Sequence, residues 1–170
     1  SGAFEPQTLS SRAGYTPSDV SRLHHLFDYT ATAAFSAWAV VPEALDTMRA
    51  IGDELADESG LQGWAALRAH NSDLCRRARD LLCEAVNAKP PVPDALLAHM
   101  AVIPFPPLTN PSATINSDPL WRRLRHEHGI QAPVWIQPGV DLRCLRVSAQ
   151  AYNEIGQYER LATLLSDSTG

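Results

Sequence analysis

The segment 61–86 constrains the fold most, because its apolar residues recur at helical spacing over about six turns. The positions of this stripe step by three and four residues and are Trp64, Leu67, Asn71, Leu74, Ala78, Leu81 and Ala85. Such a period predicts a long amphipathic helix with one buried face. A helix of this kind needs a second layer of structure against which that face can be buried.

Asn71 is the one polar residue in this apolar stripe. A buried amide without a hydrogen-bond partner costs about 1–3 kcal/mol. We therefore expect Asn71 to find partners in or beside the core. The expected role is structural, tying a neighbouring backbone in place, and contact with a ligand is the alternative.

A second helix is expected within residues 35–52, where one face repeats at spacings of three and four. That face is predicted to be buried and consists of Phe35, Trp38, Val41, Leu45 and Met48. Pro42 lies inside the pattern, so it either kinks the helix or belongs to its first turn.

Two more helices are indicated by their end signals. In the segment "SDPLWRRLRHEHG", Asp118 suits the N-cap, Pro119 the first helical position and Gly129 the residue after the end. The last helix is expected at roughly residues 153–166, with Asn153 as its N-cap.

Strands are expected around "MAVIPFPP", "APVWIQ" and residues 142–148, with a short helical turn at 93–99 before the first of them. The "PGVD" turn between the last two strands predicts a hairpin. The order of elements predicts an α+β fold, with a small antiparallel or mixed sheet of about three to four strands covered by helices on one side.

The strand at 142–148 carries two arginines on opposite faces, because successive side chains of a strand alternate. Arg143 shares its face with Leu145 and Val147. Arg146 leaves the less apolar face near the strand end, beside Ser148. This position predicts a guanidinium presented to an anion.

Composition excludes several classes of function. A net charge of −5 gives no surplus of cations for a nucleic-acid surface. The longest nearly apolar run, "ATAAFSAWAVV", is too short to span a bilayer, and the start shows no signal peptide. Three cysteines without CxxC spacing favour a reducing compartment. We expect a cytoplasmic protein with neither nucleic acid nor a membrane as partner.

Metal and nucleophile chemistry also lacks support in the sequence. His126 and His128 are two residues apart on a helix and so do not share a face, which argues against a metal site. Cys75 and Cys83, eight residues apart on one helix, are expected to be small core residues. Lys89 is the only lysine, and we expect a solvated cation there because a nucleophilic lysine needs a desolvated pocket.

The C-terminal segment "RVSAQAYNEIGQYERLATLL" closely resembles the end of class V aminotransferase-type enzymes, which use pyridoxal phosphate (PLP). It is most similar to the branch with isopenicillin N epimerase-like proteins and hercynylcysteine sulfoxide lyases. Segments similar to other parts of that branch occur in the same order over about residues 24–166, namely "FDYTATAAFSAWAVVPEALDTM", "RAHNSDL", "HMAVIPFP" and "LRHEHGIQAPV".

The resemblance implies the small C-terminal domain of a fold-type I PLP enzyme over residues 29–170, after an irregular or helical lead-in at 1–28. Arg146 matches the family's arginine that binds the substrate α-carboxylate, a task suited to a planar guanidinium. Thr32 matches a threonine that reaches the cofactor phosphate of the neighbouring subunit in a homodimer. Asn71 and Asn153 are then structural polar residues, and no catalytic residue is expected.

Residues of the family's large PLP-binding domain, including its Schiff-base lysine, have no counterpart in this sequence. PLP is therefore expected in a complete parent enzyme and not bound to this chain alone. The partner would be that large domain, in the same chain or in a separate subunit. The parent reaction would be of the epimerase or C–S lyase type on an amino-acid substrate.

The alternative is a free-standing, non-catalytic binding or assembly domain derived from such an enzyme. Ala31, Ala33 and Ala34 favour it slightly, because they replace polar or glycine positions and weaken the phosphate contact expected of Thr32. Without its large domain, the chain is expected to expose the apolar face that would pack on that domain, and to self-associate. The candidates for this face are the "FSAWAVV" segment and the N-terminal segment.

Overall fold

A computed structural model of the chain describes residues 35–56, 60–105, 118–137 and 142–169, together with Asp19, Ser21, His24 and Gly139. The chain divides into two compact units, Ser1–Leu45 and Asp46–Gly170. The lead-in expected over residues 1–28 falls almost wholly outside the described residues, as does Thr32 with its neighbouring alanines.

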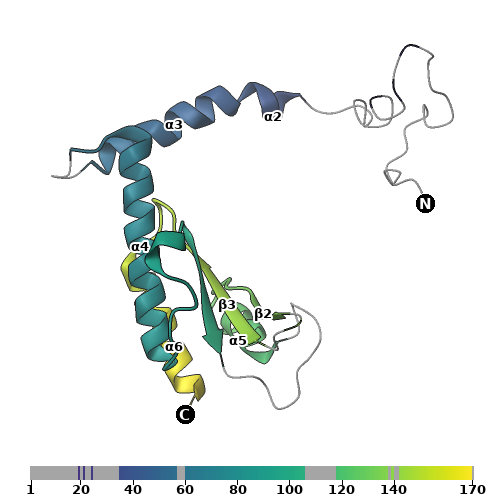
Figure 1. Cartoon of the computed structure of the whole chain (residues 1–170), viewed down its shortest axis with the longest axis vertical. Coiled ribbons are helices and arrows are strands. Elements are labelled where there is room, and N and C mark those ends of the chain that lie inside the picture. Colours follow the sequence, from purple (N-terminus) through teal and green to yellow (C-terminus); the bar gives the residue numbers. More distant parts are fainter. Residues whose placement is uncertain are drawn as a thin grey trace. The chain divides into compact units, whose positions relative to one another are not determined.

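The second unit is built on a three-stranded antiparallel sheet (Figure 1). The strands are β1 (Met100–Phe105), β2 (Val134–Gln137) and β3 (Leu142–Ser148), in the order β1-β3-β2. β3 is therefore the central strand. The expected hairpin of β2 and β3 is confirmed, and so is the α+β fold class.

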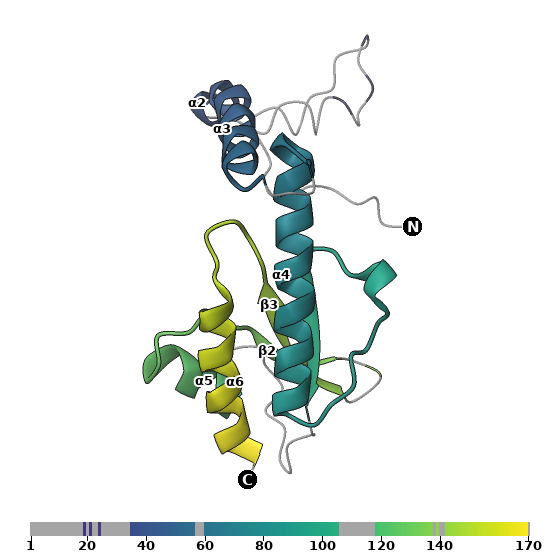
Figure 2. The same cartoon turned by 90° about the vertical axis from the view of Figure 1, so that its left-hand side faces the viewer.

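Two long helices, α4 (Gly63–Ala85) and α6 (Ile155–Thr169), lie side by side on one face of this sheet (Figures 1 and 2). The side chains at the centre of this layer are fully buried, among them Leu82, Ile103, Leu124, Val134, Leu145 and Leu165. Helix α5 (Pro119–His126) packs beside α6, where the Arg123 guanidinium donates to the carbonyl of Leu164 at 2.7 Å. A short 3-10 helix, η1 (Asp94–Leu96), precedes β1.

Helix α4 confirms the long helix expected from the apolar stripe. Its stripe residues are buried or half-buried along the whole helix. The 3.6-residue period predicted the buried face of α4 correctly because the sheet and α6 pack against that face.

The two faces of β3 differ in burial, as strand alternation predicts. Arg143, Leu145 and Val147 are buried toward the helices, whereas Leu142, Arg146 and Ser148 on the opposite face are exposed. Cys144 is buried on that second face, where it is paired with Pro104 on one side and Trp135 on the other. The two arginines of one strand consequently have opposite environments.

Arg143 forms a buried ion pair with Asp118, which the sequence predicted only as a helix cap. The guanidinium donates from Nε and Nη2 to the two carboxylate oxygens of Asp118 at 2.8 and 2.7 Å. One of these oxygens also accepts the backbone N–H of Leu120 at 2.9 Å, so the predicted N-cap is present. Arg143 and Asp118 are only 8% and 5% exposed.

The expectation of a buried face over residues 35–52 is wrong. The segment forms α2 (Ser36–Ala39) and α3 (Val41–Glu54), with Pro42 in the first turn of α3. Phe35 and Trp38 are 74% and 71% exposed, and Val41 and Leu45 are exposed too. An apolar period shows which face of a helix is able to be buried, but not that the same chain supplies a cover.

We predict that Arg143→Met lowers the free energy of unfolding by about 3–5 kcal/mol, because it leaves the Asp118 carboxylate buried without its cation. Arg146→Met, on the other face of the same strand, should change it by no more than about 0.5 kcal/mol. Urea unfolding followed by circular dichroism measures both variants. Equal destabilisation by the two would contradict the assignment of Arg143 as the structural arginine.

Candidate anion-binding pocket

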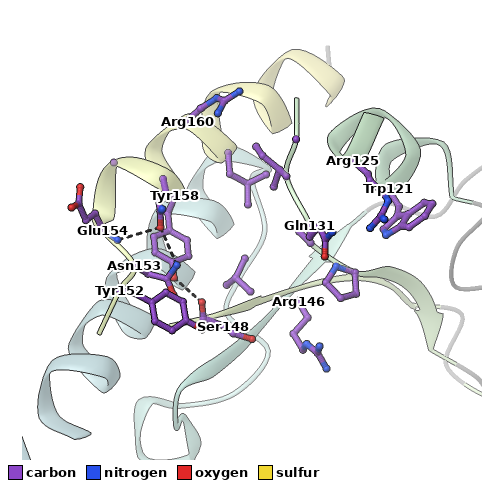
Figure 3. A pocket seen from close by; sticks show the side chains of 18 residues that line it. Trp121, Arg125, Gln131, Arg146, Ser148, Tyr152, Asn153, Glu154, Tyr158 and Arg160 are labelled. Carbon is purple, nitrogen blue, oxygen red and sulfur yellow. Dashed lines mark hydrogen bonds between the residues drawn. The ribbon is translucent and has the colours of Figure 1, made fainter. Parts of the chain in front are cut away.

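A pocket of about 780 Å³ lies where β3, α6 and the chain between α5 and β2 come together (Figure 3). Its charged lining residues are Arg125, Arg146, Arg160 and Glu154. Its aromatic and polar lining residues include Trp121, Gln131, Ser148, Tyr152, Asn153, Gln157 and Tyr158.

The pocket exists because β3 is longer than its partner β2. Pairing of β2 with β3 begins at Val134 opposite Leu145, so the last three residues of β3 have no β2 residue beside them. The segment preceding β2 passes there instead, held by the backbone N–H of Arg146, which donates to the carbonyl of Pro133 at 3.0 Å. Past this contact, Ser148 at the end of β3 has no strand beside it on the β2 side.

Arg146 is exposed at the edge of this pocket. Within the described part of the chain, its guanidinium has no ion pair and no side-chain hydrogen bond. Arg143, three residues earlier, is in contrast fully engaged by Asp118. Arg146 is therefore available to an anion, as the strand alternation predicted.

Two further arginines, Arg125 and Arg160, line the same pocket. Arg160, in α6, donates from Nη2 to the carbonyl of His128 at 3.1 Å. The guanidinium of Arg125 lies over the ring of Trp121, 5.6 Å from its centroid. Glu154 is the only carboxylate that the described lining contributes, so three cations outnumber one anion in the lining, which favours an anionic ligand.

Hydrogen bonds fix the loop between β3 and α6, which forms one wall of the pocket. Asn153 accepts the backbone N–H of Gln150 at 3.1 Å and donates to the side chain of Gln157 at 3.0 Å. Gln157 in turn accepts the backbone N–H of Glu154 at 3.2 Å. Because α6 begins at Ile155, Asn153 lies before the helix and orders the loop, in place of the predicted N-cap role.

The same loop is tied to the helical layer by two buried side chains. Asn71, which is 1% exposed, donates to the side-chain oxygen of Gln150 at 2.7 Å, and that oxygen also accepts the backbone N–H of Ala151. Tyr158 donates to the carbonyl of Ser148 at 2.7 Å, and burial raises the pKa of its hydroxyl, which keeps it a donor. The partner of Asn71 is thus a side chain and not the expected backbone.

The structure does not place Lys89 as a Schiff-base lysine. Lys89 is exposed in the segment after α4, and a Schiff-base lysine needs a desolvated surrounding. Thr32 lies outside the described residues.

The cysteines are core residues, as expected for Cys75 and Cys83. Burial raises the pKa of the thiols of Cys75, Cys83 and Cys144, which disfavours the reactive thiolate. In the described ranges, no three His, Cys, Asp or Glu side chains are grouped in a way that could hold a metal ion. None of the described helices combines the length and apolar character that crossing a bilayer requires.

Sequence reasoning singled out Arg146 as an anion-binding candidate and did not single out Arg125 and Arg160, which line the same pocket. The three come from α5, β3 and α6, so no local pattern connects them. The only available signal was the density of arginines in the segment "LWRRLRH" of α5.

Comparison with known proteins leaves the family open. The chain matches none of the protein-family models against which it was scanned. A search of curated proteins likewise gives no match. The function proposed below rests on the geometry of the pocket and on the resemblance of the sequence segments described above.

Proposed function

We propose that this chain is the small domain of a PLP-dependent enzyme of the epimerase or C–S lyase type, and that Arg146 binds the α-carboxylate of its amino-acid substrate. The cofactor and the residues that act on it belong to a large domain, provided by the same polypeptide or by a second one. The small domain contributes the carboxylate anchor and one wall of the substrate site.

The observation that carries this proposal is the contrast between Arg143 and Arg146 on β3. Arg143 is buried and paired, whereas Arg146 is exposed, unpaired by any described residue and part of a pocket lined by three arginines and one carboxylate. A guanidinium presents parallel N–H donors that match a carboxylate in two-pronged geometry. Ser148, two residues further on the same face, adds a hydroxyl beside it.

The exposed aromatic residues of the first unit favour a second candidate function, that of a binding or assembly module. Phe35, Trp38 and Val40 are 74%, 71% and 59% exposed within six residues of sequence. Large apolar side chains gathered in this way mark surfaces that bind another protein. The same surface would serve a small domain by packing on its large domain, so both functions predict an interface there.

Binding of a simple carboxylate tests the anchor. Butyrate should shift the backbone amides of residues 146–148 and the Nε–H of Arg146 in NMR spectra of the chain. Arg146→Gln should weaken this binding by at least about tenfold, because charge-assisted hydrogen bonds contribute roughly 1.5–3 kcal/mol. Arg68→Gln, on the exposed side of α4, is the matched control and should have no effect. Unchanged binding in Arg146→Gln would contradict the anchor role.

Reconstitution tests the role of the domain in a PLP enzyme. A PLP-lysine domain should be encoded upstream or in a neighbouring reading frame, and co-expression with this chain should yield a complex with the visible absorption of bound cofactor. In that complex Arg146→Gln should keep the absorption and raise KM for the amino acid. The chain alone, treated with PLP and borohydride, should give no adduct confined to Lys89, and such an adduct would overturn the proposal.

Self-association tests the surface of the first unit. The isolated chain should associate with increasing concentration in sedimentation experiments, and the double substitution Phe35→Ser with Trp38→Ser should make it monomeric. Leu96→Ser is the control, because Leu96 is equally exposed, at 74%, but belongs to η1 in the second unit. A chain that stays monomeric at all concentrations would argue against an interface on α2.

A further inference from the structure

We infer that Arg146 binds a carboxylate whose substituent is apolar, and that this substituent lies on the face of the sheet opposite the helices, against Met100 and Val102. The inference rests on the proposed function, because it takes Arg146 as the carboxylate anchor. It adds the chemical class of the substrate, an amino acid with an extended apolar side chain, and the surface that this side chain contacts.

Arg146 leaves β3 on the open face of the sheet, the face opposite α4 and α6 (Figures 1 and 2). Side chains alternate along a strand, and on β3 the alternate residues are buried toward the helices, whereas Arg146 and Ser148 are exposed. Figure 3 shows the Arg146 side chain directed away from Arg160 of α6 and from Arg125 of α5. The neighbours of a group bound to Arg146 are therefore the side chains of the open face.

The register of β1 and β3 places two apolar side chains beside Arg146 on that face. Val102 is paired with Arg146, and Met100 is paired with Ser148. Residues directly opposite in an antiparallel pair share a face, with Cβ atoms about 4.5–5.5 Å apart, and diagonal neighbours are about 7–8 Å apart. Met100 is 58% exposed and Val102 is half-buried. A short chain attached to a carboxylate on Arg146 is able to reach both.

The open face is apolar apart from Arg146 and two uncharged polar residues, Gln137 and Ser148. The strands β1, β2 and β3 contain no Asp or Glu. A charged substrate side chain would find no counterion on these strands and would lose hydration there, whereas an apolar one would remove apolar surface from water. The apolar residues of the face are Met100, Val102, Pro104, Trp135, Leu142 and Cys144.

The experiment titrates acetate, butyrate and hexanoate into the chain at constant ionic strength. NMR signals of the Nε–H of Arg146 and of the methyl groups of Met100 and Val102 report binding. Hexanoate should bind about tenfold more tightly than acetate, since a fully buried methylene contributes about a factor of four in affinity and contact with one face about a factor of two. Nuclear Overhauser effects should connect the hexanoate chain to both methyl-bearing side chains. Hexylamine, which has a cation in place of the carboxylate, should not perturb Arg146.

Variants locate the apolar contact. Met100→Gln and Val102→Thr nearly keep the shapes of the side chains but make them polar, so each should reduce the advantage of hexanoate over acetate by about two- to threefold. Leu142→Gln is the matched control, because Leu142 is exposed on the same face of β3, but four residues from Arg146, or about 13 Å along the strand. It should keep the full advantage of hexanoate. Arg146→Gln should weaken the binding of all three carboxylates.

The outcomes separate the inference from the proposed function. If acetate and hexanoate bind equally well and Arg146→Gln weakens both, the apolar contact is wrong and the carboxylate anchor stands. If Leu142→Gln reduces the advantage of hexanoate as much as Met100→Gln does, the ligand chain lies elsewhere and the inference is overturned. It is also overturned if the methyl signals of Met100 and Val102 shift with protein concentration without ligand, because the face is then an interface between copies. If no carboxylate affects the Arg146 resonance, both the inference and the anchor role are wrong.

Discussion

The buried ion pair of Arg143 and Asp118 is the interaction on which the arrangement around the pocket depends. It joins the central strand of the sheet to the first turn of α5, across 25 residues of sequence. One carboxylate oxygen serves at once as helix cap and as ion-pair partner. A buried charge without its partner is far more costly than the pair itself, so β3 and α5 are held in one relative position. The residues after α5 form a wall of the pocket, and this pair therefore determines where that wall begins.

Arg143 and Arg146 show how one strand supplies both structure and function. Three positions separate them, and because strand side chains alternate, an odd separation puts the two guanidiniums on opposite faces. The face toward the helices has a buried carboxylate to receive one of them. The other face continues into a pocket whose described residues leave Arg146 without an ion pair.

A second link runs from the helical layer to the pocket through Asn71 and Gln150. The one polar residue of the α4 stripe bonds the side chain that orders the loop after β3. Asn153 and Gln157 continue this network to the start of α6. The wall of the pocket is thus held by a hydrogen-bond network that starts at the buried Asn71, and such supporting contacts are how a binding site retains its geometry.

Features encoded within a few neighbouring residues were determined by the sequence alone. The period of 3.6 defined α4, the Asp118-Pro119 pair marked the start of α5, and alternation along β3 turned Arg146 away from the helices. These features depend on the local geometry of helices and strands, which is the same in every chain that forms them.

The partners of the same residues were decided only by the tertiary structure. Asp118 meets Arg143, Asn71 meets Gln150 across 79 residues, and Arg125 and Arg160 join Arg146 at one pocket. The exposed face of α2 is a further case, because a stripe of apolar residues does not show what covers it. Such pairings form between segments that are distant in the sequence, and a short sequence pattern does not show which distant segments come into contact.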